Sequence, residues 1–504
     1  INSDWTRGPA GSGVTDFAAG ANSLEDSEGP ELATSFETLD GITWKFQIRQ
    51  GVHWQLVNSD AGRLMNGREM TVDDVVSSWN RLAASPRAWA NVSQPAVMKA
   101  ATVKKTGLWE ITVKTPVDPI TAFSWVTGGA GFLLIYPPEV LAKYGNAKDW
   151  KNAVGTGPYI IRDYVPGSQL TYTRNPNYWE TNPVGPGKGD QLPYINTYVQ
   201  LVIPDLSTRQ AALRVGKLDA MSGVTMEDFG TLMKSSPKLE SLVTLSNQPY
   251  VIGMRRDKKD KPFSDIRVRQ ALMLATDFNA FKNDYYGGNA EIDVFPVNKS
   301  VVPFYQPLSE MPESVQTLFN YNPEKARQLL KDAGYPSGFK ASILVTGTTQ
   351  IDEVSIFKDQ WAKIGVELVI DTRESGAFNT VATARAHEDM IYRSMFQTFS
   401  IQLFLSGLRG TSTFNSSYVN DPPGSDPYVE ARYQSIQDNV FKNPSVAYQA
   451  YRELKPYVLE QAFYIPRPTP YSYSVWWPWL KNYYGQGFLK YNWIDQDLKK
   501  TMGY

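Results

Sequence analysis

The 504-residue sequence contains no cysteine and only two histidines, His53 and His387. The absence of cysteine excludes disulfides, thiolate metal sites and cysteine nucleophiles. Two histidines are too few for a histidine-rich zinc site. The sequence also lacks a Gly-x-Ser-x-Gly elbow, a Gly-x-x-x-x-Gly-Lys-Ser/Thr loop, a dinucleotide fingerprint and an EF-hand pattern. These absences argue against the enzyme classes that short motifs reveal, and no cofactor or metal is expected.

Excess charge and long apolar runs are missing as well. Lys and Arg number 50 against 51 Asp and Glu, so the net charge is -1 and no global field favours a nucleic-acid partner. The longest apolar candidate, residues 131–142, is broken by Pro137 and Pro138 and is shorter than the roughly 20 residues of a membrane helix. The chain starts at Ile1 without Met or a signal peptide, so we expect an N-terminus that is processed, truncated or partly unobserved, in which a lost lipid anchor would not be visible.

Aromatic residues are abundant, at 13% of the chain. Part of this content must pack cores, and the remainder suits a cleft that stacks on sugars or encloses apolar groups. A length of 504 residues exceeds one core and suggests roughly three domains.

The hydrophobic patterns of strands and helices alternate along the chain. Residues 42–48 and 108–114 alternate apolar and polar side chains, which predicts half-buried strands. Residues 72–82 carry an apolar stripe at helical spacing, with Thr71 as N-cap and Asp74 in a capping-box position. The mixture predicts an α/β or α+β class.

Catalytic candidates are weak when each is weighed against a structural explanation. His53 follows a predicted strand beside Trp54 and is expected to pack there, whereas His387 lies in a polar stretch and is expected to face solvent. The visible carboxylate clusters are Asp73-Asp74, Glu388-Asp389 and Asp257 with Asp260. A glycosidase needs two carboxyls about 5–9.5 Å apart, a separation that the sequence cannot show, and charge clusters are usually solvated. The glycine-rich residues 185–189 (GPGKG) have the wrong spacing for a phosphate loop and predict a surface loop.

Several motifs in fixed order resemble one family, the large solute-binding proteins of ABC importers that include the oligopeptide- and nickel-binding proteins. The quoted segments are residues 31–37 (ELATSFE), 44–54 (WKFQIRQGVHW), 66–82 (NGREMTVDDVVSSWNRL), 155–159 (GTGPY), 174–179 (RNPNYW), 262–272 (PFSDIRVRQAL), 322–335 (NPEKA through AGY) and 462–466 (AFYIP). Each motif alone is weak, but together they keep their order from about residue 31 to the C-terminus.

The resemblance implies an α/β fold of the two-lobed, type II periplasmic-binding-protein class with an additional domain. Lobe I would consist of residues 1–30, 153–252 and 476–504, the additional domain of 31–152, and lobe II of 253–475. The chain would cross between lobes near 248–254 and 471–473. The ligand would bind between the lobes, and closure would present the protein to a membrane permease.

One stretch departs from the pattern of peptide-binding members. These often carry Gly-Trp followed by an Asp that holds the peptide amino group, whereas residues 394–399 here read SMFQTF and no acid occurs from 390 to 420. A buried ammonium would lack its counter-charge. A neutral or anionic ligand fits better, with Arg393 taking a carboxylate or Gln397 and aromatics holding a sugar; burial of Met395 and Phe399 in a strand is the structural alternative.

The sequence therefore predicts a non-enzymatic, monomeric, extracytoplasmic receptor of an ABC importer, in the periplasm or on the cell surface. Its ligand would be an oligopeptide or an oligosaccharide-like molecule. The alternatives are a secreted carbohydrate-active enzyme and a ligand-sensing receptor that is not coupled to transport. The residues expected to bind ligand are Trp5, Arg7, Gln248, Tyr250, Arg393, Phe396, Gln397 and Phe399.

Overall fold

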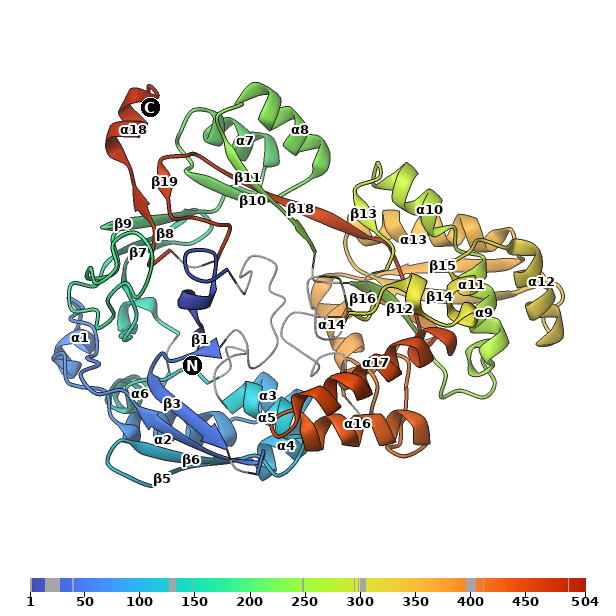
Figure 1. The fold of residues 1–504 in the computed structure, drawn as a ribbon, viewed down its shortest axis with the longest axis horizontal. Coiled ribbons are helices and arrows are strands. Elements are labelled where there is room, and N and C mark those ends of the chain that lie inside the picture. Colours follow the sequence, from blue (N-terminus) through green and yellow to red (C-terminus); the bar gives the residue numbers. More distant parts are fainter. Residues whose placement is uncertain are drawn as a thin grey trace. The chain divides into compact units, whose positions relative to one another are not determined.

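A computed structural model shows a mixed α/β protein built on several separate sheets (Figure 1). The structure describes residues 2–13, 28–38, 40–126, 133–146, 148–246, 249–293, 295–297, 299, 305–395, 405–410, 412–487 and 489–504. Backbone contacts divide the chain into two compact units. The first contains Leu24–Thr244 and Ser472–Tyr504 with the N-terminal segment, and the second contains Leu245–Tyr471.

The first unit contains the predicted strand pair and the capped helix. Its largest sheet is antiparallel with the order β3-β4-β6-β5, and α2 packs against β5. These strands are β3 (Ala33–Thr38), β4 (Thr43–Ile48), β5 (Thr102–Lys105) and β6 (Glu110–Lys114). The alternation predicted at residues 42–48 is confirmed, because Trp44, Phe46 and Ile48 are buried and Lys45 and Gln47 are exposed.

The remaining elements of the first unit form smaller sheets and short helices. A three-stranded sheet has the order β7-β8-β9, β1 pairs with β2, and β19 pairs with β20. The strands are β1 (Asn2–Ser3), β2 (Glu28–Gly29), β7 (Tyr159–Val165), β8 (Gln169–Arg174), β9 (Thr197–Leu201), β10 (Ala220–Val224), β11 (Glu240–Leu245), β19 (Leu480–Lys481) and β20 (Trp493–Ile494). The helices are η1 (Trp5–Arg7), α1 (Asp60–Met65), α2 (Val72–Ala84), α3 (Trp89–Ser93), α4 (Pro95–Ala100), α5 (Pro119–Val126), α6 (Pro138–Tyr144), η2 (Trp150–Asn152), α7 (Leu206–Arg214), α8 (Met226–Ser235) and α18 (Gln496–Thr501).

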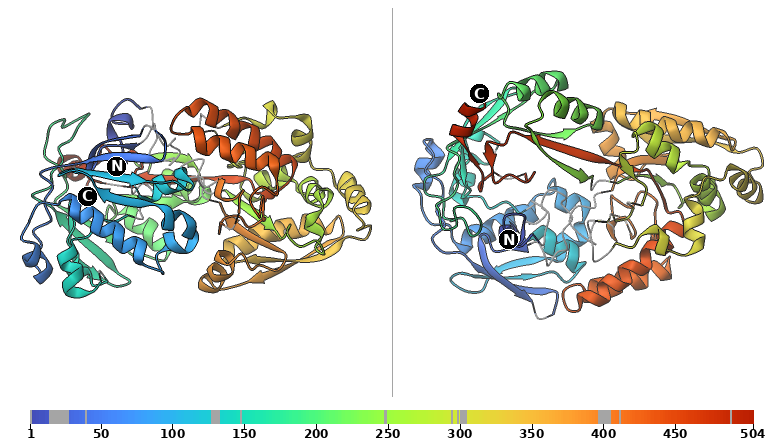
Figure 2. Two further views of the ribbon diagram at one scale, coloured as in Figure 1. Left: turned by 90° about the horizontal axis from the view of Figure 1, so that it is seen from below. Right: turned by 45° about the horizontal axis from the view of Figure 1, so that its top comes forward.

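The second unit is organised around a five-stranded sheet with the order β15-β14-β16-β12-β17. Its strands are β12 (Tyr250–Met254), β13 (Ala290–Glu291), β14 (Phe339–Val345), β15 (Val366–Thr372), β16 (Met390–Ser394) and β17 (Tyr464–Pro466). Its helices are η3 (Pro262–Ser264), α9 (Ile266–Leu274), α10 (Phe278–Ala280), η4 (Phe281–Tyr285), η5 (Leu308–Glu310), α11 (Glu313–Leu318), α12 (Pro323–Asp332), α13 (Thr348–Ala362), α14 (Ser375–Thr383), α16 (Pro427–Asn439) and α17 (Pro444–Glu460). Figure 2 shows α16 and α17 packed side by side.

The chain passes between the units twice. The first passage follows β11, and the second lies within β18 (Thr469–Trp476), which pairs with β10 and β11 and, at its start, with β13. The expected crossing at 248–254 is displaced, because β12 lies inside the second unit between β16 and β17. Its apolar run comes from burial on both faces of a central strand, where Val251, Ile252 and Met254 are fully buried.

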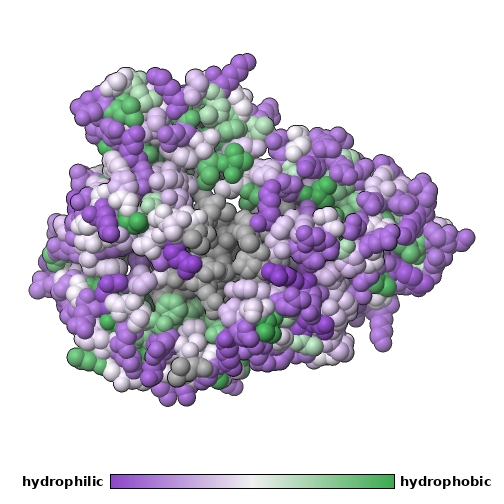
Figure 3. All heavy atoms as spheres, viewed as in Figure 1, coloured by the Kyte–Doolittle hydropathy of each residue, from purple (hydrophilic) through white to green (hydrophobic). Residues whose placement is uncertain are grey.

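Surface properties agree with the composition. Figure 3 shows scattered hydrophobic spots on a mainly hydrophilic surface. Among the described residues, none of the helices combines the length and apolar character needed to span a membrane. The glycine-rich residues 185–189 lie in an exposed loop, as predicted. The separation of residues 31–152 from the rest of lobe I stays a prediction.

Candidate functional site

The carboxyl edge of the second unit's sheet provides the best-defined location for a ligand. β14 runs parallel to both β15 and β16. The helix after β14 leads to β15 on one side, whereas β16 lies on the other side, so the strand order reverses between β14 and β16. Ligands of open α/β sheets bind outside the carboxyl ends of strands at such a switch point. β16 ends there with Arg393 and Ser394.

Arg393 is half-buried at this edge and has no carboxylate partner in any ion pair among the described residues. Its Nη1 donates a hydrogen bond to the carbonyl oxygen of Thr413 over 2.8 Å, and its guanidinium carbon lies 5.2 Å from the centroid of the Phe414 ring. Burial lowers the pKa of Arg393, yet arginine stays protonated at neutral pH. The arrangement leaves a positive charge whose natural complement is an anionic group.

Tyr250, the second predicted residue in this unit, begins β12 beside the end of β16. It pairs with Ser394 across the ladder, and its ring centroid lies 5.2 Å from that of Tyr392. Its side chain is half-buried. Arg393 instead pairs with Val251, so the period of two places Arg393 and Tyr250 on opposite faces of the sheet at the same edge.

A buried polar network supports the Tyr250 face, and the sequence analysis does not identify it. Arg467, directly after β17, lies 3.1 Å from Glu353 of α13 between Nε and Oε1, with 6% and 4% of the two side chains exposed. Tyr286 donates to Glu353 Oε1 and Tyr392 donates to Oε2, each over 2.6 Å. Both carboxylate oxygens therefore already have partners inside this unit.

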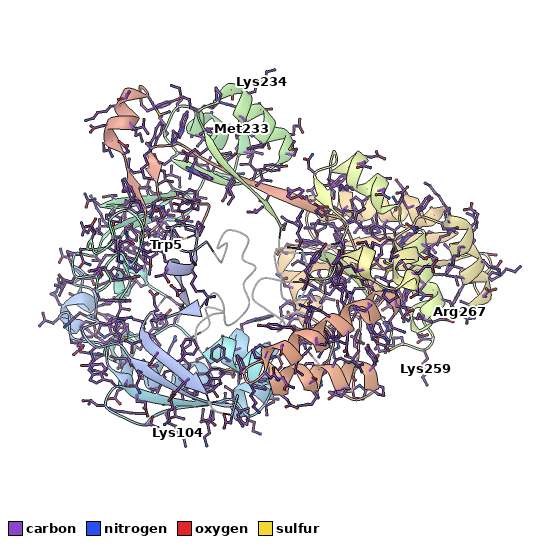
Figure 4. The ribbon with its side chains drawn as sticks, viewed as in Figure 1. Trp5, Lys104, Met233, Lys234, Lys259 and Arg267 are labelled. Atoms are coloured by element: carbon purple, nitrogen blue, oxygen red, sulfur yellow. The ribbon has the colours of Figure 1, made fainter. Side chains whose placement is uncertain are left out.

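The two predicted residues of the first unit lie in and beside a core cluster. Trp5, labelled in Figure 4, is 2% exposed and stacks on Tyr491 at 4.6 Å between ring centroids. Tyr178 and Leu192 complete this cluster. Arg7 is half-buried at the end of η1. The packing of Trp5 favours a structural contribution, and a role of either residue in binding stays a prediction.

Four other predicted residues cannot be placed. Gln248, Phe396, Gln397 and Phe399 lie outside the described residues. Met395, the described residue directly before Phe396, is buried, and its N–H donates to the carbonyl oxygen of Pro249.

The histidines show no catalytic arrangement. His387 is 2% exposed, which contradicts the expectation that it faces solvent, and burial lowers its pKa to about 3. The sequence around His387 is polar, but its neighbours in the fold enclose it. Arg255 donates to the His387 carbonyl oxygen over 2.8 Å, and the His387 ring lies 6.1 Å from the Tyr418 ring. His53 is exposed, which contradicts the expectation that it packs beside Trp54, and its Nδ1 lies 2.7 Å from the carbonyl oxygen of Gly67.

The carboxylate clusters are engaged in structural contacts. Asp74 binds the Arg68 guanidinium through both oxygens, and Asp257 does the same with Arg255. Asp389 accepts from Lys261 over 2.7 Å and from the Ser342 N–H and hydroxyl. No group of metal-ligating side chains is found in the part of the chain that the structure describes. The carboxylates of Asp74, Asp257 and Asp389 are therefore engaged in charge pairs and do not form an open acid–base pair.

Comparison with known proteins identifies the family. The model of the bacterial extracellular solute-binding proteins, family 5 Middle, matches residues 29–416. The chain belongs to this family. Heme-binding protein A of Haemophilus influenzae is 25% identical over 503 residues, which cover 93% of this chain and 83% of the relative.

Solved structures show the same fold. Periplasmic binding protein DppA of Helicobacter pylori, in complex with the peptide STSA, superimposes with a TM-score of 0.73 at 22% identity and covers 93% of this chain and 89% of its own. AgaA of A. tumefaciens R10, in complex with agropinic acid, has a TM-score of 0.72 at 20% identity, with coverages of 94% and 91%. The predicted α/β, two-lobed type II fold and the role as a family 5 solute-binding protein of ABC import are confirmed at the level of the family.

Proposed function

We propose that this protein is a non-enzymatic, monomeric, extracytoplasmic receptor that captures a small carboxylate-bearing ligand and delivers it to an ABC permease. Ligand contact with both lobes would stabilise a closed state, which the permease recognises. A location in the periplasm or, with a lipid anchor, on the cell surface suits this role. The observation that carries the ligand class is Arg393, a half-buried cation at the sheet edge.

The same edge disfavours a ligand that depends on a free amine. Residues 390–420 contain no acid, and the carboxylate of Glu353 already accepts from Tyr286 and Tyr392 and lies in an ion pair with Arg467. An ammonium brought against this stretch would be desolvated without a counter-charge from residues 390–420. Among the relatives, heme-binding protein A is named for heme, which carries carboxylates without an amine, whereas DppA of Helicobacter pylori holds a peptide.

Calorimetric titration with matched probes tests the ligand class. N-acetyl-Met-Leu has a free carboxylate and a blocked amine, Met-Leu amide has the reverse, and unmodified Met-Leu, hemin and maltotriose complete the panel. We expect N-acetyl-Met-Leu to bind at least as tightly as Met-Leu and at least tenfold more tightly than Met-Leu amide. Equal affinity for N-acetyl-Met-Leu and Met-Leu amide would overturn the proposal that the protein recognises a carboxylate.

Substitution of Arg393 tests the residue. Arg393→Met is expected to weaken carboxylate binding at least tenfold, because a charge-assisted pair in a half-buried site contributes about 1.5–3 kcal/mol. Arg373 supplies a matched control: it follows β15 at the same edge but pairs with Asp371 over 2.8 Å. Arg373→Met should leave the affinity within twofold. Equal losses in the two variants would contradict the assignment.

The enzyme and sensor alternatives predict different results. A carbohydrate-active enzyme would release product from maltotriose, whereas a receptor returns every probe unchanged. A sensing receptor would bind the same probes without a partner permease. Binding without turnover, together with uptake that depends on a neighbouring permease, supports the importer role.

A further inference from the structure

The buried polar network beside Tyr250 carries a desolvation cost, and a contribution to stability does not by itself explain its presence. It places the charges of Arg467 and Glu353 out of water at the edge of the sheet, with side chains 6% and 4% exposed. Buried ion pairs are often no more stabilising than apolar residues of similar volume, because desolvation offsets their attraction. The hydroxyl bonds to Glu353 and the Arg467 Nη1 bond to Pro468 do, however, hold these side chains in one arrangement.

Contacts of Arg467 converge on Tyr250. The Arg467 N–H donates to the Tyr250 carbonyl oxygen over 3.2 Å, and its guanidinium carbon lies 5.0 Å from the centroid of the Tyr250 ring. Its Nη1 also donates to the Pro468 carbonyl oxygen over 2.6 Å, which fixes the side chain from the other direction. A planar guanidinium over an aromatic face is a specific contact that lysine does not reproduce.

Glu353 fixes the remaining side of the network. It anchors Arg467 by the ion pair and holds the hydroxyl of Tyr392, whose ring lies against the Tyr250 ring. The Tyr250 ring is thus restrained by the Arg467 guanidinium and by the Tyr392 ring, whose hydroxyl is bonded to Glu353. The Tyr250 side chain itself is half-buried at this edge.

From these contacts we infer that Arg467 and Glu353 are positioning residues that hold the Tyr250 ring in its ligand-binding orientation. The inference rests on the proposed function, because it assigns Tyr250 to the ligand site at this edge. Arg467 and Glu353 do not touch the ligand. They act by removing conformations of Tyr250 that would otherwise have to be excluded on binding.

A charge-neutral double variant separates positioning from folding. In Arg467→Met combined with Glu353→Gln, no charge is left unpaired, and the amide can still bond the two tyrosine hydroxyls. We expect the thermal midpoint to stay within a few degrees, while the affinity for N-acetyl-Met-Leu falls five- to twentyfold. Unchanged affinity in this folded variant would overturn the inference. Arg467→Lys should lose at least threefold, because it keeps the charge without the planar fork.

A double-mutant cycle tests whether Arg467 acts through Tyr250. Tyr250→Ala should weaken binding of N-acetyl-Met-Leu about tenfold, and adding Arg467→Met should change the affinity by less than twofold. Additive losses would show that Arg467 acts by another route. If Tyr250→Ala leaves binding intact while Arg393→Met abolishes it, the inference fails and the proposed function stands. If neither substitution affects binding of any carboxylate probe, the proposed function fails as well.

A spectroscopic readout does not depend on the ligand. With 3-fluorotyrosine incorporated at position 250, the wild-type protein should show one narrow ¹⁹F resonance. The charge-neutral double variant should show broadened or multiple resonances, because the ring samples several orientations. One narrow resonance in both proteins would contradict the positioning role.

Discussion

At the scale of single residues, Arg393 and Arg467 differ in whether they have a carboxylate partner among the described residues: Arg467 is paired with Glu353, whereas Arg393 has none. Arg393 was singled out because its stretch departs from the family pattern; it lies at the end of β16, and its role in ligand binding stays a prediction. Glu353 and Arg467 could not be found in this way. They lie on separate elements, and only the sheet order brings them together.

His387 makes the protein sensitive to acid. Its ring is 2% exposed, and burial lowers its pKa to about 3 from the usual value near 6.5. Between those values the unfolded chain binds a proton that the folded protein excludes, so the free energy of unfolding falls as the pH is lowered from about 6.5 toward 3. The loss is about 1.4 kcal/mol per pH unit once the pH is well below 6.5.

Chemical denaturation at pH 7 and pH 5 measures this loss. His387→Gln should lose less free energy between the two pH values than the wild type, by about 2 kcal/mol, because carboxylates titrate alike in both proteins. His53→Gln, which changes the exposed histidine, is the control and should behave as the wild type. The same pH dependence in the wild type and His387→Gln would contradict a buried neutral imidazole.

At the scale of secondary structure, strong local signals were predicted correctly. The helix predicted over residues 72–82 is present as α2, with Asp74 accepting from the Thr71 N–H. β12 shows the limit of such signals: an apolar run fits both a crossing strand and a central strand, and its partners β16 and β17 are distant in sequence. Capping chemistry is local, whereas strand partners are set by the whole unit.

The start of α2 offers a stability test with two adjacent acids. Asp74 is 2% exposed, accepts from the Thr71 N–H, and holds Arg68 through both oxygens. Asp74→Ala removes these bonds and leaves Arg68 paired with Glu139 alone, so the free energy of unfolding should fall by about 3 kcal/mol.

Asp73→Ala is the matched control. Asp73 is 70% exposed and pairs only at the surface with Lys105 over 2.7 Å. Its loss should change the free energy of unfolding by no more than about 0.5 kcal/mol. Similar losses from Asp73→Ala and Asp74→Ala in urea titrations would contradict the buried role of the capping carboxylate.

At the scale of the whole molecule, the order of motifs carried more information than any motif alone. The motifs span both units, from residue 31 to 466, and the family match covers residues 29–416. Ligand identity could not be predicted with equal sharpness, because specificity lies in a few side chains on faces that only the fold defines. The high aromatic content was a weak guide to the ligand site, because an aromatic residue such as Trp5 packs in a core cluster.

Ligand binding should compact and stabilise the protein. A ligand that joins two lobes favours the closed state, so the radius of gyration in small-angle scattering should decrease on saturation with N-acetyl-Met-Leu. At a ligand concentration of 100 Kd, the free energy of unfolding should rise by about 2.7 kcal/mol. Stabilisation without compaction would contradict closure and leave binding to one lobe.

The most direct test of the central claim is calorimetric titration of the full chain with N-acetyl-Met-Leu and Met-Leu amide, followed by mass analysis of the recovered probe. The account predicts saturable 1:1 binding of the free carboxylate, recovery of the probe unchanged, and at least tenfold weaker binding both of the amide and after Arg393→Met. Equal binding of the two probes, or recovery of cleaved probe, would contradict it.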